Sequence, residues 1–258
     1  KGAALMRLKE LFHDTAYAVR FAKPWPDLDV KGVTDDSRGV VQGGLFAALP
    51  PACDVTQSGD AFIPDALGKG AKAVIVLRRS ADTWQKRHPD VCFIPADDPR
   101  GLFEAAVERF YGYPSRKVRV LGITGTNGKT TITYFLESII KAAGKKSGVV
   151  GTVNCRVGDR VLPSKNTTPG FLHNQTFLAD LAAQRVLYAV MEVSSHALVQ
   201  RRVDRIDFRG AVFTNLTRDH LDFHHTMEEY FAAKQLLFDG CGAPPPGRVA
   251  VNLDDPYG

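Results

Sequence analysis

Cysteine is scarce in this sequence, and its spacing excludes two common ways of stabilising a small fold. The four cysteines, Cys53, Cys92, Cys155 and Cys241, lie far apart and form no Cys-x-x-Cys pair. A zinc knuckle or a disulfide framework would need closely spaced or systematically paired cysteines. We therefore expect reduced and buried thiols.

Long apolar runs are also absent. Aliphatic stretches such as AVIVL, which begins at Ala73, are far too short to cross a bilayer, and no charged-then-apolar leader opens the sequence. The 258 residues are 44% hydrophobic and 24% charged, as in an ordinary soluble globular protein with room for two domains. We expect a cytoplasmic protein without a membrane partner, and the oligomeric state stays open.

A strong excess of one charge is missing as well. The net charge of +5 comes from 33 basic and 28 acidic residues, and the basic ones form only short groups such as Arg78-Arg79 and Arg201-Arg202. This pattern is weak support for nucleic acid, and we predict no nucleic-acid partner. It fits equally well an enzyme whose cleft collects phosphates, because a positive potential concentrates anionic ligands.

The order of apolar runs and helical patterns predicts an α/β domain over residues 1–115. A helical pattern over 5–12 is followed by short apolar runs at 44–49, 73–78 and 91–96, with another helical pattern over 61–70 between the first two. A last helix runs from about Pro99 to Tyr111 and ends in GYPSRK, whose glycine, proline and serine indicate a loop. We expect the domain boundary there.

A longer alternation of strands and helices begins at residue 116. The pattern predicts helices over 129–143, from 171 and from 227, and strands over 118–123, 147–152, 187–193, 210–215 and 248–253. The strands are nearly continuous in Val, Ile and Leu, as expected when helices cover both faces of a parallel sheet. We predict a doubly wound nucleotide-binding domain. Because the sequence ends where such a sheet would normally continue, we expect a piece of something longer.

The stretch GITGTNGKTTITYF, residues 122–135, is the main candidate for a phosphate-binding loop. The strict Walker pattern requires glycine at position 123, where this sequence has isoleucine. Four features nevertheless agree: a buried strand, a tight loop with Gly125 and Gly128, a lysine at 129, and a threonine at 130 that opens a helix. Together they supply backbone N–H groups, an ammonium and a hydroxyl for phosphates and Mg²⁺.

Polar residues follow two other predicted strands. Glu192 ends an apolar strand, where an unpaired buried carboxylate would be costly and a metal ion bridging ATP oxygens would remove that cost. A solvated strand-end glutamate is the alternative. The next strand is followed by Asp219, His220, Asp222, His224 and His225. Three histidines without a spaced fourth ligand make a poor zinc site, and polar loop chemistry is the alternative there.

An ordered set of motifs carries a family resemblance. GITGTNGKTT, NTTP, MEVSSHALVQRR, FTNLTRDHLDFH with MEEYFAAK, and NLDD resemble the Mur ligases, most closely the MurE type, over about Val33 to Gly258. GTNGKTT alone marks only a wider superfamily that includes folylpolyglutamate synthases. Those enzymes place the loop near the chain start, whereas about 115 residues precede it here, which favours a Mur ligase.

The resemblance implies ATP-dependent amide formation in peptidoglycan synthesis, with ATP, Mg²⁺, UDP-MurNAc-L-Ala-D-Glu and an amino acid as partners. A glutamate carboxylate attacks the γ-phosphorus, an acyl phosphate forms, and diaminopimelate or lysine displaces phosphate. The implied fold is a small N-terminal α/β UDP-binding domain (1–115) and a mostly parallel P-loop ATPase domain (116–258). The second is expected to be incomplete, with the family's C-terminal Rossmann-like domain absent and the chain alone inactive.

The resemblance also implies roles for individual residues. Lys129, Glu192, His220 and Lys234 would be catalytic, with Thr130 and Glu192 serving one Mg²⁺, His220 a second, and Lys234 acting as a carbamate ligand. Without that context, Lys234 would be an exposed helix lysine. ATP binding is implied for Gly125, Thr126, Asn127, Gly128, Lys129, Thr130 and Thr131. Substrate binding is implied for Ser37, Asn166, Thr167, Thr168, Ser194, Gln200 and Arg202.

Two departures from the family pattern affect the expected uridine pocket. In DDSRGVVQGGLF, Gly44 stands where the family has aspartate, and Ser58 replaces another usual aspartate. Asp36 and Arg38 then have a structural interpretation beside the functional one. Three alternatives also remain for the function: a non-catalytic nucleotide-binding module, a UDP-sugar-binding module, and another ligase of the same superfamily. The sequence leaves the added amino acid and the carbamylation of Lys234 open.

Overall fold

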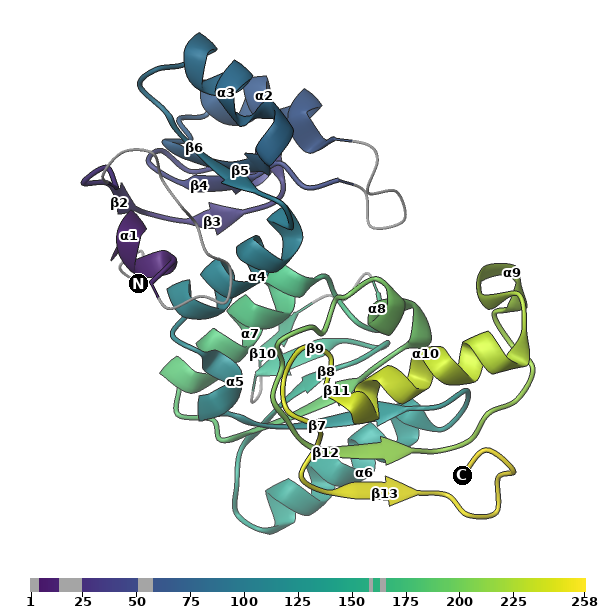
Figure 1. Ribbon diagram of the computed structural model, residues 1–258. Helices are drawn as coiled ribbons and strands as arrows, with labels where there is room; N and C mark the ends of the chain where they lie inside the picture. Colours follow the sequence, from purple (N-terminus) through teal and green to yellow (C-terminus); the bar gives the residue numbers. More distant parts are fainter. Residues whose placement is uncertain (1–4, 14–24, 51–57, 158–159, 163–165) are drawn as a thin grey trace. The chain divides into compact units, whose positions relative to one another are not determined.

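The computed structural model describes residues 5–13, 25–50, 58–157, 160–162 and 166–258, and it divides into two compact units, Lys1–Gly112 and Tyr113–Gly258 (Figure 1). In the described part of the chain, none of the helices has the length and apolar character needed to span a membrane. Each unit is built around its own sheet.

The first unit contains a four-stranded parallel sheet. Its buried strands pack against short helices through a core that includes Phe46, Ile63, Val74 and Phe93. In sheet order the strands are β3 (Val33–Thr34), β4 (Leu45–Ala47), β5 (Ala73–Leu77) and β6 (Cys92–Ala96). The helices are η1 (Ser37–Gly39), η2 (Gly59–Phe62), α2 (Ile63–Gly68), α3 (Arg78–Arg87) and α4 (Pro99–Phe110). A separate antiparallel pair precedes them, formed by β1 (Met6–Arg7) and β2 (Asp29–Val30), with α1 (Leu8–Leu11).

The second unit contains a seven-stranded sheet in which five consecutive strands, reaching one edge of the sheet, are parallel. Its strands in sheet order are β10 (Arg160–Leu162), β9 (Cys155–Val157), β8 (Ser147–Val150), β11 (Tyr188–Glu192), β7 (Arg119–Thr124), β12 (Phe208–Phe213) and β13 (Val249–Val251). Its helices are α5 (Pro114–Lys117), α6 (Lys129–Ala142), α7 (Phe171–Ala183), α8 (Ser195–Val199), α9 (Leu221–His224) and α10 (Met227–Asp239).

Helices cover both faces of this sheet, as Figure 1 shows. On one face, Ile123 of β7 and Val190 of β11 pack against Ile140 of α6. On the other face, α7 and α10 contribute side chains such as Leu181 and Leu237 to a larger core. The predicted doubly wound, mostly parallel α/β fold is therefore confirmed.

Strand order places a topological switch at β7. The chain runs from β7 through α6 to β8, then inserts β11 between them, and continues with β12 on the other side of β7. In open α/β sheets, ligands bind outside the carboxyl ends of the strands at such a switch point. The candidate site should therefore lie where β7, β11 and β12 end.

Several elements were not predicted, among them α3, the β9–β10 pair and α5. The helix α3 has a largely polar sequence with Ala81 as its buried residue, so few apolar residues mark it as a helix. The strands β9 and β10 form an antiparallel edge pair of three residues each. The segment PSRK, expected as loop, forms the short helix α5, because Pro114 stands at its first position, where a proline is well tolerated.

The cysteines follow the expectation in part. Cys92, Cys155 and Cys241 are free thiols, of which Cys155 is buried and the other two are half-buried. Burial raises the pKa of the Cys92 thiol to about 11 and that of Cys241 to about 12, so these thiols stay protonated at neutral pH. Cys53 lies outside the described residues.

Candidate active site

The loop between β7 and α6 has backbone angles that only glycine adopts readily. Gly125 has a φ of 139° and Gly128 a φ of 84°. A Cβ atom on Gly125 would lie 1.9 Å from Thr214 Oγ1, so the close approach of β12 also requires glycine there. The loop is thus a tight, glycine-dependent turn leading into the N-terminus of a 14-residue helix, where backbone N–H groups favour an anion.

Residues at the end of β12 hold the loop from one side. Thr214 Oγ1 donates a hydrogen bond to the carbonyl of Asn127 (2.6 Å), and Asn215 Oδ1 accepts one from the backbone N–H of Asn127 (3.0 Å). The carbonyl of Asn215 accepts from the N–H of Thr126 (2.8 Å). Sequence reasoning missed Thr214 and Asn215, although their position directly after a buried strand is a usable signal.

Lys129 lies folded over the loop. Its Nζ atom donates to the carbonyls of Gly125 (2.9 Å) and Thr126 (2.8 Å). Burial lowers the pKa of Lys129, and the charges of Glu192 and Asp219 oppose that shift. The ammonium is therefore positioned on the loop that a phosphate would occupy.

Glu192 ends β11 and is almost fully buried, with 2% of its surface exposed. Its carboxylate accepts hydrogen bonds from Thr130 Oγ1 (2.9 Å), Thr152 Oγ1 (2.9 Å) and the backbone N–H of Thr152 (3.2 Å). A Cβ atom on Gly151 would lie 2.2 Å from Glu192 Oε1, so glycine makes room for the carboxylate. The solvated strand-end glutamate, the alternative considered above, is wrong.

The adjacent oxygen atoms of Glu192 and Thr130 fit a hard divalent cation, because Mg²⁺ prefers carboxylate and hydroxyl oxygens together with phosphate. Within the described residues, no group of three or more His, Cys, Asp or Glu side chains is arranged to hold a metal by itself. A cation at Glu192 would therefore take its remaining ligands from a bound anion or water.

Lys234 is buried rather than exposed, which corrects the expectation for an unmodified helix lysine. It is 1% exposed, its Nζ atom donates to the Gly125 carbonyl (2.8 Å), and it lies 4.3 Å from the ring centroid of Tyr230. Burial, and then the charge of Lys129, lower the pKa of Lys234 to about 7. A substantial fraction of this amine is thus uncharged at neutral pH.

Histidine side chains lie beyond the loop, around α9. His220 has a left-handed backbone (φ 53°), and its ring lies 4.8 Å from that of His196 and 6.0 Å from that of Tyr230, measured between centroids. His224 is buried, with Nε2 2.9 Å from Ser195 Oγ, and burial lowers its pKa to about 4. The ring contact with Tyr230 places the predicted residue His220 beside α10.

Tyr230 links these histidines to the phosphate-binding loop. Its hydroxyl lies 3.2 Å from Thr126 Oγ1, and its ring lies 5.0 Å from that of His224 between centroids. The side chain is buried and forms part of a core with Phe213 and Leu216. This residue was not selected from the sequence, because an aromatic side chain within a predicted helix is usually part of the core.

Four of the residues predicted to bind substrate meet at the carboxyl end of β11. Thr168 Oγ1 donates to the carbonyl of Glu192 (2.8 Å) and accepts from the N–H of Ser194 (3.1 Å). Arg202 donates through Nη1 to the Thr168 carbonyl (3.0 Å) and through Nη2 to Gln200 Oε1. These contacts order the side chains next to Glu192.

The other three predicted substrate residues differ in their surroundings. Thr167 Oγ1 lies 3.1 Å from Thr152 Oγ1, and Asn166 is exposed just before it. Ser37 is in the first unit and is buried, with its carbonyl accepting from Lys69 Nζ (3.2 Å). A contact between Ser37 and a uridine stays a prediction.

Asp36 and Arg38 flank Ser37 and form a paired structure. The Asp36 carboxylate caps η1 by accepting from the backbone N–H of Arg38 (2.9 Å) and also accepts from its guanidinium at Nε and Nη2. The hydrogen bonds from Arg38 lower the pKa of Asp36 to about 2. These contacts support the structural interpretation of the two residues.

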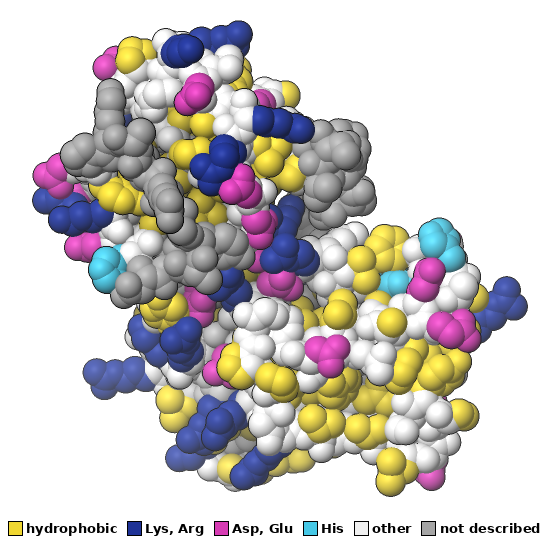
Figure 2. All heavy atoms as spheres, viewed as in Figure 1, with side chains coloured by type: hydrophobic (Ala, Val, Ile, Leu, Met, Phe, Trp, Pro, Cys, Tyr) yellow, Lys and Arg dark blue, Asp and Glu magenta, His cyan; other side chains and the backbone are white. Residues whose placement is uncertain are grey.

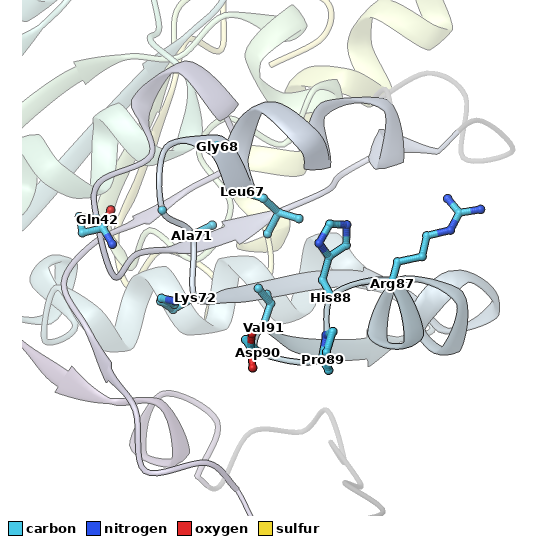
Figure 3. Close-up of a pocket in the computed structure, with 11 residues that line it drawn as sticks. Gln42, Leu67, Gly68, Ala71, Lys72, Arg87, His88, Pro89, Asp90 and Val91 are labelled. Atoms are coloured by element: carbon cyan, nitrogen blue, oxygen red, sulfur yellow. The ribbon is translucent and has the colours of Figure 1, made fainter.

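Among the hollows lined by described residues, the following two lie in different units. One, of about 480 Å³, lies in the first unit where β5 and β6 begin, and includes Lys72, Arg87, His88 and Asp90 (Figure 3). Because it lies at the amino ends of the strands, whereas Ser37 follows the carboxyl end of β3, we assign it no role. The other, of about 380 Å³, borders the phosphate-binding loop. Its lining is Asn127, Gly128, Ile132, Val212, Phe213, Thr214, Asn215, Ala250, Val251 and Asn252.

Comparisons with curated proteins find extensive similarity. A UDP-N-acetylmuramoyl-L-alanyl-D-glutamate–2,6-diaminopimelate ligase of Solibacter usitatus is 41% identical over 252 residues, covering 98% of this chain and 49% of the relative. The ligase of the same name from Geobacter metallireducens is 44% identical over 236 residues, covering 90% and 44%. The chain thus spans about half the length of the curated relatives it matches.

Solved structures and a family model agree with this similarity. A structure of a UDP-N-acetylmuramoyl-L-alanyl-D-glutamate–2,6-diaminopimelate ligase has a TM-score of 0.70 and 30% identity, covering 98% of this chain and 48% of that one. MurF from Acinetobacter baumannii shares the fold, with a TM-score of 0.58 and 19% identity. The match covers 90% of this chain and 46% of the MurF chain. A model of the Mur ligase middle domain matches residues 123–258, more than half of the chain. With the glycine loop, Lys129 and Glu192 inside the matched region, the chain belongs to the Mur ligase family.

Proposed function

We propose that the protein containing this chain is an ATP-dependent ligase that adds an amino acid to UDP-MurNAc-L-Ala-D-Glu in peptidoglycan synthesis, in the cytoplasm. One observation carries the proposal: Lys129 and Lys234 converge on the carbonyl of Gly125, in a loop adjoining the buried Glu192. The Lys129 ammonium and the Lys234 amine, whose pKa is lowered by burial and by the charge of Lys129, crowd one carbonyl oxygen, and an anionic phosphate would balance the positive charge gathered there.

The second unit would bind ATP along the loop from Gly125 to Thr131. The N-terminal N–H groups of α6 and the Lys129 ammonium would hold the β- and γ-phosphates. The hollow beside the loop, which includes Ile132, Val212 and Val251, would receive the nucleoside. This orientation would leave the γ-phosphate near Glu192 and the substrate residues.

Thr130 and Glu192 would hold one Mg²⁺, and His220 would serve a second. Mg²⁺, when bound, would neutralise the negative charge that develops on the phosphate oxygens during transfer. The protein's own part is to orient the Glu192 carboxylate, which three hydrogen bonds from Thr130 and Thr152 do.

Lys234 would act as a carbamate. Its amine nitrogen would attack CO₂, forming an N–C bond, moving one C=O electron pair onto oxygen and releasing a proton from nitrogen. A pKa of about 7 supports this step, because the uncharged amine is the reactive form. The product would be an anionic oxygen ligand where an ammonium would repel both Lys129 and a cation.

The UDP-muramoyl dipeptide would lie against Thr168, Ser194, Gln200 and Arg202, with Asn166, Thr167 and Ser37 as further contacts. The Arg202 guanidinium suits a carboxylate or a phosphate, since it offers a planar pair of donors. The substrate's glutamate carboxylate would then attack the γ-phosphorus, and an amine would displace phosphate from the acyl phosphate. Because the relatives described above are named for 2,6-diaminopimelate, we favour diaminopimelate over lysine as that amine.

ADP release tests the proposal. The full-length gene product is mixed with MgATP, UDP-MurNAc-L-Ala-D-Glu and either diaminopimelate or lysine, and each component is omitted in turn. We expect ADP only when all three substrates are present, and faster with diaminopimelate. A protein that binds ATP but releases no ADP with either amino acid would be a nucleotide-binding module instead.

A further inference from the structure

Thr152 donates hydrogen bonds to both oxygens of the Glu192 carboxylate. It follows β8, and its backbone N–H donates to Oε1 (3.2 Å) while its hydroxyl donates to Oε2 (2.9 Å). Thr130 contacts only Oε2. Thr152 therefore fixes the rotation of the carboxylate in a way that a single hydrogen bond cannot.

The same hydroxyl connects Glu192 to residues 166–168, which are predicted to bind substrate and are here called the substrate loop. Thr152 Oγ1 lies 3.1 Å from Thr167 Oγ1. An ionised carboxylate only accepts hydrogen bonds, so the one hydrogen of the Thr152 hydroxyl is directed to Glu192, and Thr167 must supply the hydrogen between the two hydroxyls. The result is a directed chain from Thr167 through Thr152 to Glu192.

The backbone next to Thr152 and next to Thr167 supports this chain of hydrogen bonds. Gly151 leaves no room for a side chain, because its Cβ atom would lie 2.2 Å from Glu192 Oε1. Thr168, the next residue after Thr167, donates to the Glu192 carbonyl (2.8 Å). The substrate loop is thus tied to Glu192 twice, once at the backbone and once through Thr152.

We propose that Thr152 is a positioning residue that orients the Glu192 carboxylate for a divalent cation and couples it, through Thr167, to the substrate loop. The inference rests on the proposed function in taking Glu192 as a cation ligand. It adds a residue that lies outside the phosphate-binding loop in the sequence.

The test measures equilibrium binding of ADP to the full-length gene product over a range of Mg²⁺ concentrations. Thr152→Val replaces the hydroxyl with a methyl group of similar size and keeps the backbone N–H. We expect the Mg²⁺ concentration for half-maximal ADP binding to rise about tenfold, the value of one charge-assisted hydrogen bond. ADP affinity without Mg²⁺ should stay unchanged, which general damage to the site would not allow.

Matched variants separate the hydroxyl from the side-chain shape. Thr152→Ser keeps the hydroxyl and should retain the wild-type Mg²⁺ dependence. Thr176→Val in α7 removes a hydroxyl that donates to the carbonyl of His173 within its own helix, and should also leave it unchanged. A wild-type Mg²⁺ dependence in Thr152→Val would overturn the positioning role.

A double-mutant cycle tests the coupling. Thr167→Val alone should raise the Mg²⁺ requirement about threefold, and it should add nothing in the Thr152→Val background. Additive effects would overturn the coupling through Thr152. A wild-type protein that binds no ADP at any Mg²⁺ concentration would instead overturn the proposed function together with this inference.

Discussion

Three ionisable side chains lie around one short loop, and each is held there by different contacts. Lys129 stays on the loop as a partly buried donor, Glu192 is fixed by hydroxyl and amide donors, and Lys234 is shifted towards the uncharged amine. The two lysines contact the same carbonyl of Gly125 and differ in burial, because Lys234 is fully buried and Lys129 is half-buried.

Removing the Lys129 ammonium should abolish most nucleotide-dependent chemistry. We expect Lys129→Ala to lower ATP turnover by about 100-fold or more, since it removes a donor aimed at phosphate. Lys145→Ala, at an exposed position just beyond α6, is the matched control and should retain turnover. Steady-state ADP release measures both, and near-normal turnover in Lys129→Ala would exclude the proposed phosphate contact.

The carbamate role of Lys234 can be tested by chemical rescue. Lys234→Ala should lose turnover, and added bicarbonate or short carboxylates should restore part of it by supplying an anionic oxygen in the vacated space. The same additives should not rescue Lys129→Ala, whose missing group is a cation. Turnover that is unchanged in Lys234→Ala would remove its proposed metal role.

The sequence predicted some site residues better than others, for physical reasons. Lys129 and Glu192 could be located because each occupies a defined position at the end of a buried strand or the start of a helix. The burial of Lys234 had a weaker sequence signal. That signal is the helical spacing that puts Lys234 on one face of α10 with Tyr230, Ala233 and Leu237. Contacts such as Thr152 with Glu192 could not be predicted, because they join residues 40 positions apart.

At the scale of secondary-structure elements, the ends of β7, β11 and β12 and the start of α6 create the candidate site. The five parallel strands were predictable from the sequence because each is an apolar run. The helix α3 was missed because it buries few side chains, and the β9–β10 pair was missed because its strands are very short. Glycine performs two different tasks along α6. Gly125 allows a close approach at its N-terminal loop, and Gly144 ends the helix with a φ of 69°.

Alanine substitutions at these two glycines should have different effects. At Gly125 the new Cβ atom would meet Thr214 Oγ1, whereas at Gly144 nothing lies within 4 Å. We expect Gly144→Ala to cost about 1 kcal/mol of unfolding free energy and leave ADP binding intact. Gly125→Ala should weaken ADP binding at least about tenfold, besides backbone strain of about 1–3 kcal/mol.

Denaturant unfolding and ADP titration of both variants check this contrast. Equal ADP affinities in Gly125→Ala and Gly144→Ala would mean that the loop geometry does not determine nucleotide binding.

At the scale of the whole molecule, two compact units carry different parts of the predicted chemistry. The Tyr113–Gly258 unit holds the loop, Glu192 and most predicted substrate residues, while Ser37 lies in the Lys1–Gly112 unit. Lys and Arg side chains and acidic side chains both occur on the face that Figure 2 shows. Because the net charge of +5 is modest for 258 residues, we expect anion binding to depend on the local loop geometry.

Ligand-dependent stability should report Mg²⁺ binding by the 258-residue chain. With MgADP at 100 times its Kd, the expected stabilisation is about 2.7 kcal/mol, which corresponds to a rise in Tm of about 5–10 °C. Chelating Mg²⁺ with EDTA should remove at least half of that rise, because Glu192 and Thr130 would lose the cation they share with the phosphates. A rise that EDTA leaves intact would contradict the Mg²⁺ site.

The most direct test of the ligase mechanism follows the oxygen atoms of the substrate. UDP-MurNAc-L-Ala-D-Glu labelled with oxygen-18 in the reacting glutamate carboxylate is converted by the full-length gene product with MgATP and diaminopimelate, and the released phosphate is analysed by mass spectrometry. Attack of this carboxylate on the γ-phosphorus predicts the transfer of one labelled oxygen to each phosphate. Unlabelled phosphate would show that water, rather than the carboxylate, accepts the phosphoryl group, and would contradict the account.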